Sequence, residues 1–136
     1  MSRQKIIPVP TPETQHFWDG TRMGELRLQK CVSCYSVYFP PRPFCPACSS
    51  KEIEIITSSG KGKIHTFIIS NFRSPGFDTP YSIAVVELEE GPRMLTNIVG
   101  CEQSSDVIKM EMDVEAVFEP ASDEINLVKF KLTEVV

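Results

Sequence analysis

The 136-residue sequence lacks the motifs by which most self-sufficient enzymes are recognised. It contains no G-x-S-x-G nucleophile elbow, no H-E-x-x-H metalloprotease helix, no dinucleotide-binding G-x-G-x-x-G and no phosphoryl-transfer motif. Its two histidines, His16 and His65, lie far apart in the chain. These absences disfavour the catalytic classes that depend on such motifs and favour a binding or assembly module over an enzyme.

Long apolar stretches are also missing from the sequence. No run approaches the about 20 residues that a transmembrane helix needs. Residues 1–15 contain no apolar segment of the kind that directs export. We therefore expect a cytoplasmic protein, whose 41% hydrophobic and 24% charged residues are typical of a globular domain.

Cysteine, in contrast, is present in a recognisable pattern. Four of the five cysteines follow the spacing C-x2-C-x10-C-x2-C, namely Cys31, Cys34, Cys45 and Cys48. Two turns that each carry two thiolates can surround one tetrahedral ion, so this spacing predicts a structural metal site, with zinc first and iron second. Four thiolates leave no coordination position for a substrate. The fifth residue, Cys101, is expected to be a small buried side chain.

Two other interpretations of the four cysteines remain open at this stage. A disulfide framework would need an oxidising compartment, for which residues 1–15 carry no export signal. A redox dithiol is the second alternative, but such sites use one C-x-x-C in a strand and helix context and not a matched pair.

The N-terminal part is expected to contain short helices. Several prolines predict an extended arm over residues 1–11, and Thr11-Pro12-Glu13 is a favourable helix start. This helix should run to about Asp19 and stop at Gly20, with a second short turn over 21–24. A helix of two turns is unstable alone, so Phe17 and Trp18 must pack on the ribbon or on a sheet.

Hydrophobic alternation predicts strands over most of the remaining chain. Two short strands, 26–30 and 36–39, flank the first cysteine pair, and 52–57 leads out of the ribbon. Five strands follow near 64–70, 81–89, 93–99, 112–119 and 125–133, with Lys129 and Lys131 on the polar side of the last. The pattern predicts a mainly β fold with N-terminal short helices (1–25), a zinc ribbon (26–50) and a C-terminal five-stranded OB-fold barrel (51–136).

Charge is distributed unevenly along the chain. Residues 1–75 carry ten Lys/Arg against five Asp/Glu, and residues 76–136 carry four against thirteen. The first half therefore has a net charge of +5 and the second half of −9, which sum to the −4 of the whole chain. An anion-binding surface is expected in the first half.

Several segments together resemble one known family. These are the helix with Phe17 and Trp18, the segment Gly24-Glu25-Leu26-Arg27-Leu28-Gln29-Lys30-Cys31-Val32-Ser33-Cys34, then Phe39-Pro40-Pro41-Arg42, Cys45-Pro46-Ala47-Cys48, Pro80-Tyr81 and Glu87-Leu88-Glu89-Glu90-Gly91. From about residue 12 onward the chain resembles the DUF35 family, acyl-CoA-associated proteins with a rubredoxin-like zinc ribbon joined to an OB-fold. The resemblance implies a non-catalytic partner of thiolase-fold enzymes that catalyse acetyl transfer, condensation or retro-aldol cleavage.

Two functions follow as hypotheses. The first is an acyl-CoA-binding or scaffolding subunit of such an enzyme complex, in which arginines contact the CoA phosphates and aromatic side chains line a groove for its apolar arm. The candidate ligand-binding residues are Phe17, Trp18, Arg22, Arg42, Phe72 and Arg73. The alternative is a nucleic-acid-binding zinc-ribbon and OB-fold module, which the acidic second half disfavours.

Overall fold

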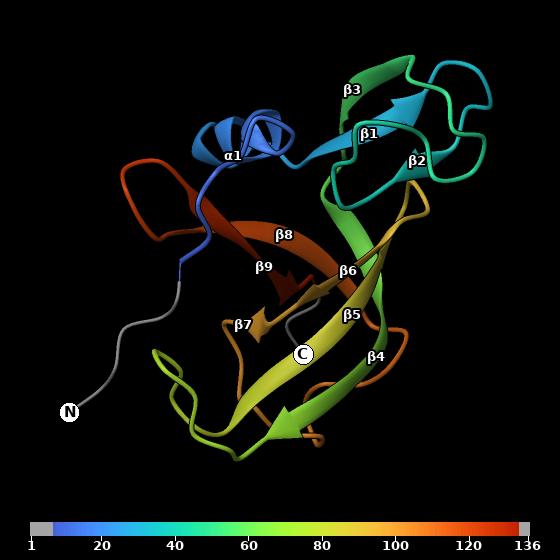
Figure 1. The fold of residues 1–136 in the computed structure, drawn as a ribbon. Helices are drawn as coiled ribbons and strands as arrows, with labels where there is room; N and C mark the ends of the chain where they lie inside the picture. Colours follow the sequence, from blue (N-terminus) through green and yellow to red (C-terminus); the bar gives the residue numbers. More distant parts are fainter. Residues whose placement is uncertain (1–6, 134–136) are drawn as a thin grey trace.

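The computed structural model describes residues 7–133, which form one helix and nine strands (Figure 1). In chain order these are α1 (Gln15–Arg22), β1 (Arg27–Cys31), β2 (Val37–Tyr38), β3 (Ile53–Thr57), β4 (Lys61–Ser70), β5 (Tyr81–Leu88), β6 (Arg93–Thr96), β7 (Ile98–Val99), β8 (Asp113–Pro120) and β9 (Asn126–Leu132). The predicted mainly β fold is confirmed. Part of the predicted arm, residues 1–6, lies outside the described residues. Within 7–133, no helix is long and apolar enough to cross a bilayer.

The ribbon is a small antiparallel sheet in the order β2-β1-β3. Its central strand β1 pairs with β2 through Gln29 and Tyr38 and with β3 through Gln29 and Ile55. Leu28 is 1% exposed and belongs to the main core. Gln29 is buried as well, and its Oε1 accepts the backbone N–H of Arg42 at 2.8 Å. That bond attaches the proline-rich stretch after β2 to the ribbon sheet.

The barrel is a six-stranded sheet in the order β6-β5-β4-β8-β9-β7. The sequence predicted one strand over 93–99, but this segment is split at Asn97 into β6 and β7. The split occurs because the Asn97 amide donates to the Ser82 carbonyl and the Asn97 carbonyl accepts the Phe130 N–H. As a result β6 pairs with β5, whereas β7 pairs in parallel with β9. No strand ladder joins β6 to β9 among the described residues, so the barrel is not closed at this seam.

One apolar core unites the helix, the ribbon and the barrel. Alternate residues of the barrel strands point inward and are fully buried, as Ile64, Val86 and Phe130 show. Phe17 of α1 and Leu26, just before β1, belong to the same cluster. Burial of each such side chain contributes about 1.5–3 kcal/mol, so the short helix is stabilised by packing, as predicted for Phe17.

The helix differs from its predicted bounds at both ends. It begins at Gln15 and continues through Gly20 to Arg22, so no separate turn follows it over 21–24. Gly20 does not stop the helix; it allows the returning chain to pass, because a Cβ there would lie 2.8 Å from the Arg27 side chain. Two hydrogen bonds from Asn126, to the Thr21 hydroxyl at 3.1 Å and the Thr21 carbonyl at 2.9 Å, attach α1 to β9.

A second attachment holds the linker between ribbon and barrel. Ser58 and Ser59 connect β3 to β4 and lie against the turn that joins β5 to β6. The Glu90 carboxylate accepts the Ser58 hydroxyl at 2.7 Å and the Ser59 N–H at 2.9 Å. Glu89 accepts the Ser59 hydroxyl at 2.8 Å. Burial raises the pKa of Glu90, but the hydrogen bonds that its carboxylate accepts from Ser58 and Ser59 outweigh burial and hold the pKa below its usual value.

We predict that the Glu90 contribution to stability depends on pH. Because its pKa is lowered in the folded state, the contribution is fully present above the unfolded-state pKa of about 4.3 and is lost as the pH falls through the folded-state pKa. Glu90→Gln should lower the free energy of unfolding by about 1 kcal/mol at pH 7 and by less below pH 4. Urea denaturation at several pH values measures this. Glu124→Gln, on the exposed turn before β9, is the matched control, and an equal loss in both variants would contradict the prediction.

Candidate functional site

Two loops of matching geometry carry the four cysteines. In the first loop, Cys31 is the last residue of β1. Its carbonyl accepts the Tyr35 N–H at 2.9 Å, and its N–H donates to the Ser36 carbonyl. In the second loop, the Cys45 carbonyl accepts the Ser49 N–H at 2.9 Å, and the Cys45 N–H donates to the Ser50 carbonyl. Tyr35 and Ser49 share the left-handed φ of 65°. The two C-x-x-C segments are therefore two copies of one turn.

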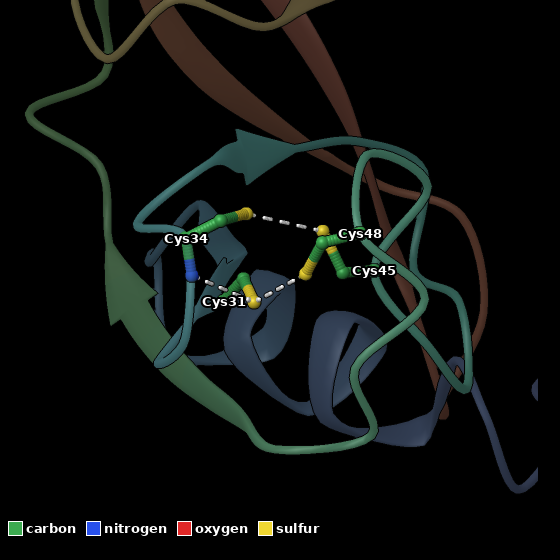
Figure 2. Close-up of side chains that lie close together, drawn as sticks. All are labelled: Cys31, Cys34, Cys45 and Cys48. Atoms are coloured by element: carbon green, nitrogen blue, oxygen red, sulfur yellow. Dashed lines mark hydrogen bonds between the residues drawn. The ribbon is translucent and has the colours of Figure 1, made fainter.

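The four sulfur atoms meet between these turns (Figure 2). All lie within 4.8 Å of one another, with 3.5 Å between Cys31 and Cys48 and 3.6 Å between Cys34 and Cys45. A tetrahedral ion with Zn–S bonds of about 2.3 Å requires sulfur separations of about 3.8 Å. The donor set thus fits a four-thiolate ion, and the predicted convergence of these residues is observed.

Polar groups around the sulfurs favour the thiolate form of Cys31 and Cys34. At Cys48 the backbone hydrogen bond at Ser50 lowers the pKa, but in the metal-free cluster the hydrogen bonds with the Cys31 and Cys34 thiols outweigh it and raise the pKa of Cys48 to about 12. The Cys34 N–H lies 3.4 Å from the Cys31 sulfur and the Ala47 N–H lies 3.3 Å from the Cys45 sulfur. The hydrogen bond with the Ser36 hydroxyl, 3.2 Å away, lowers the pKa of Cys34 to about 6. Thiolates are the form that binds metal. Cys101 lies outside the group, and burial raises the pKa of its thiol.

A groove of about 410 Å³ opens next to the ribbon, where α1 and the chain after β2 meet the barrel. It lies at the seam where Thr96 at the end of β6 donates its hydroxyl to the Val128 carbonyl of β9 at 3.1 Å. Its wall is aromatic and aliphatic with few polar groups, the lining residues being Phe17, Trp18, Phe39, Phe77, Tyr81, Ile83, Met94, Leu95, Thr96, Asn97, Leu127, Val128 and Lys129. Residues from five separate parts of the chain build this groove.

Ring contacts fix the walls of the groove. On one side, the Phe17 ring lies 4.9 Å from that of Trp18 and 5.2 Å from that of Phe39, which joins the helix to the ribbon. On the other side, Phe77 stacks on Tyr81 at 4.8 Å with an interplanar angle of 27°. Such pairs add about 0.5–1.5 kcal/mol beyond simple burial, so they stabilise the arrangement of the groove walls.

Lys129 forms part of the groove wall and was not expected there. Alternation along β9 predicted a solvent-facing side chain, but Lys129 is only 8% exposed. Its Nζ lies 2.5 Å from the Asn97 Oδ1 and 5.5 Å from the centroid of the Phe77 ring. The residues that surround it come from the loop over 71–80 and from the β6–β7 junction, and no local pattern in the sequence could have indicated that contact.

The structure brings some of the predicted ligand-binding residues together and leaves others outside the groove. Phe17 and Trp18 line it. Arg22, Arg42, Phe72 and Arg73 are exposed and do not line it. They nevertheless lie on segments that supply its walls, with Arg22 one helical turn beyond Trp18, Arg42 three residues after Phe39, and Phe72 and Arg73 in the loop that carries Phe77.

Comparison with known proteins agrees with this architecture. The family models described as "ChsH2, rubredoxin-like zinc ribbon domain" and "ChsH2, C-terminal OB-fold domain" match residues 18–54 and 56–119. A DUF35 domain-containing scaffold protein of Methanothermobacter thermautotrophicus is 41% identical over 98 residues, which cover 70% of this chain and 72% of that protein. This chain belongs to the DUF35 family.

Other similar proteins are named as subunits or parts of enzymes. A probable enoyl-CoA hydratase alpha subunit of Thermomonospora curvata is 33% identical over 85% of this chain, which spans only 36% of that subunit's length. The benzoylsuccinyl-CoA thiolase subunit BbsA of Thauera aromatica is 32% identical over 60% of this chain and 56% of its own. The solved structure titled Ltp2-ChsH2(DUF35) aldolase contains a chain with a TM-score of 0.84 and 29% identity, with 94% of this chain and 100% of that chain covered.

We predict that loss of one cysteine ligand unfolds the ribbon. Cys31→Ser or Cys48→Ser should abolish stoichiometric metal binding, because the ribbon has little apolar surface of its own and metal binding contributes most of its folding free energy. Elemental analysis and amide NMR spectra measure both effects. Cys101→Ser is the matched control and should retain the metal and the spectrum. A serine variant at position 31 or 48 with an unchanged amide spectrum would contradict the prediction.

Proposed function

We propose that this chain is a non-catalytic accessory subunit of a thiolase-fold enzyme that acts on acyl-CoA substrates, and that it binds the CoA thioester in the aromatic groove. The groove itself carries this proposal, because it is preformed, apolar and lined by few polar groups, as sites for small molecules usually are. The DUF35 relatives named as a thiolase subunit, a hydratase subunit and part of an aldolase support the enzyme class.

The metal in this proposal is structural zinc, with iron as the alternative that the same ligand set allows. Cys31, Cys34, Cys45 and Cys48 would hold the ion and supply all four of its ligands. The bound ion would cross-link the two turns and thereby hold β1 and β2 in register. Tyr38 of β2 packs on Cys31 and Cys45, and Phe39, the next residue, forms a wall of the groove. The metal would thus affect ligand binding only indirectly, by fixing the position of Phe39 in the groove wall.

The arginines in this proposal contact the CoA phosphates. Trp18 and Arg22 are four residues apart in α1 and therefore lie on the same side of the helix. Arg42 has an anchored backbone, because its N–H donates to the Gln29 side chain. A ligand whose apolar arm lies in the groove could extend its phosphates past either residue. Arg73 and Phe72 would reach such a ligand only from the opposite, 71–80 side.

Nucleic-acid binding is disfavoured by the charge of the barrel. OB-folds that bind single strands present a basic groove with stacking aromatics. Here residues 76–136 have a net charge of −9. Several of the acidic side chains pair with basic ones on neighbouring strands, as Lys63 does with Asp113 at 3.2 Å and Lys131 with Glu115 at 3.1 Å.

We predict that Trp18 is needed for binding of acetyl-CoA. Trp18→Ala removes one ring from the groove and should weaken binding about tenfold, which corresponds to about 1.4 kcal/mol. Isothermal titration calorimetry measures the affinity. Ile68→Ala is the matched control, since Ile68 is 60% exposed on β4 and does not line the groove. Equal affinities in the two variants, or no binding by the unmodified chain, would contradict acyl-CoA binding in the groove.

The assembly part of the proposal has its own test. Purification of the chain without a tag from its native host, followed by mass spectrometry, should identify a co-purifying thiolase-fold enzyme. The purified partner should bind the isolated chain again in size-exclusion chromatography. A chain that purifies alone and does not bind that enzyme would contradict the accessory role.

A further inference from the structure

The side chain of Tyr38 in β2 is buried beside the cysteine cluster. Tyr38 is 7% exposed and packs on Cys31 and Cys45, whose side chains are fully buried. Its backbone lies opposite Gln29 in the ladder between β1 and β2. Cys31 follows Gln29 by two residues and therefore lies on the same face of β1. The register of the two strands thus places the tyrosine ring against the buried cysteines.

The hydroxyl group at the end of this ring is unusual. It is buried, and it has no hydrogen-bond partner within residues 7–133. A buried hydroxyl that lacks a partner costs about 1–3 kcal/mol, and folded proteins rarely leave such a group unpaired. The Tyr38 hydroxyl therefore needs an acceptor in its surroundings.

The sulfurs of Cys31 and Cys45 are suitable acceptors. Each already lies close to one backbone N–H, that of Cys34 at 3.4 Å and that of Ala47 at 3.3 Å. An ion such as Zn²⁺ with four thiolates carries a net negative charge, so further donors to its sulfurs stabilise the site. Burial first, and then the charges of the Cys45 and Cys31 sulfurs, raise the pKa of Tyr38. The phenol thus keeps its proton and can donate.

We propose that Tyr38 supports the metal site directly: when the ion is bound, its hydroxyl donates a hydrogen bond to the sulfur of Cys31 or Cys45. Thiols lose their protons when they bind a metal, and the resulting thiolates are the stronger acceptors. The shortest sulfur separations, 3.5 and 3.6 Å, would at the same time adjust to about 3.8 Å. The bond therefore forms on metal loading and stabilises the loaded ribbon.

This inference concerns the metal site and does not depend on acyl-CoA binding. It also has a consequence for the groove, because Phe39 follows Tyr38 and lines the groove. The same bond would link metal loading to the position of that wall. The competing arrangement is a buried water that accepts from the Tyr38 hydroxyl.

The test compares two tyrosines of the ribbon. Tyr38→Phe removes the buried hydroxyl and keeps the ring that packs on the cysteines. Tyr35→Phe is the matched control, since Tyr35 is 71% exposed and its ring remains 5.7 Å from the Lys30 Nζ. Competition of the full-length, Zn²⁺-loaded chains with a chelator of known affinity measures how tightly each holds the ion.

We expect Tyr38→Phe to weaken Zn²⁺ binding about tenfold, because loss of a group that hydrogen-bonds to a metal ligand typically lowers metal affinity by about 10–100-fold. Tyr35→Phe should bind Zn²⁺ as tightly as the unmodified chain. A second measurement uses the unmodified chain loaded with an NMR-active isotope of cadmium. The hydroxyl proton of Tyr38 should show a scalar coupling to the cadmium nucleus, which arises only through a hydrogen bond to a ligand sulfur.

The cadmium measurement decides even if Tyr38→Phe fails to fold. A Tyr38 hydroxyl proton without the coupling would overturn the inference, even if the variant binds Zn²⁺ more weakly, because loss of a purely structural hydroxyl could weaken binding as well. Exchange of that proton with a long-lived buried water would assign the hydroxyl to the water and overturn the inference in the same way. Equal Zn²⁺ affinities of Tyr38→Phe and Tyr35→Phe would also contradict it.

Discussion

The convergence of four thiols is the constraint on which the ribbon and the groove depend. The ribbon strands are short, and β2 has only two residues, so their own hydrogen bonds cannot hold them. The two matching turns bring the sulfurs within 4.8 Å of one another and set the relation of β1 to β2. Tyr38 packs directly on this cluster. Since Phe39 follows it and contacts Phe17, the position of the groove wall depends on the cysteines.

The groove belongs to no single part of the fold. Its walls come from the helix, the ribbon and the barrel, and hydrogen bonds far apart in sequence hold these three together. Asn126 fixes α1 through Thr21, and Glu90 fixes the linker through Ser58 and Ser59. Neither the metal site nor the barrel alone would form the groove.

The distribution of charge fits this division of roles. Basic residues are concentrated in the helix and ribbon half, and acidic residues in the barrel. In the proposed function, the phosphates of the ligand would be attracted to the arginines of the first half, and its neutral arm would add no charge beside the acidic barrel. Lys129 is one of four Lys/Arg residues in the acidic half, and it lies on the groove wall.

The metal site, the strands and the family could be predicted from the sequence because they depend on local spacing. Two C-x-x-C turns and strict alternation need no knowledge of distant residues. The split at Asn97 could not be predicted, because it results from bonds to Ser82 and Phe130. The helix does not end at Gly20. The absence of a side chain at Gly20 leaves room for the Arg27 side chain, which is a contact with a later segment of the chain. The division into three parts at residues 25 and 50 stays a prediction.

The predicted aromatic pair Phe17 and Trp18 lines the groove, whereas Lys129 on the same groove wall was not predicted there. The sequence by itself determined which residues alternate along β9 and hence which face each side chain takes. Only the tertiary structure decided that the outer face at Lys129 is covered, because Phe77, Tyr81 and Asn97 lie on other segments. Whether a face is exposed depends on what packs over it, and that is a property of long-range contacts.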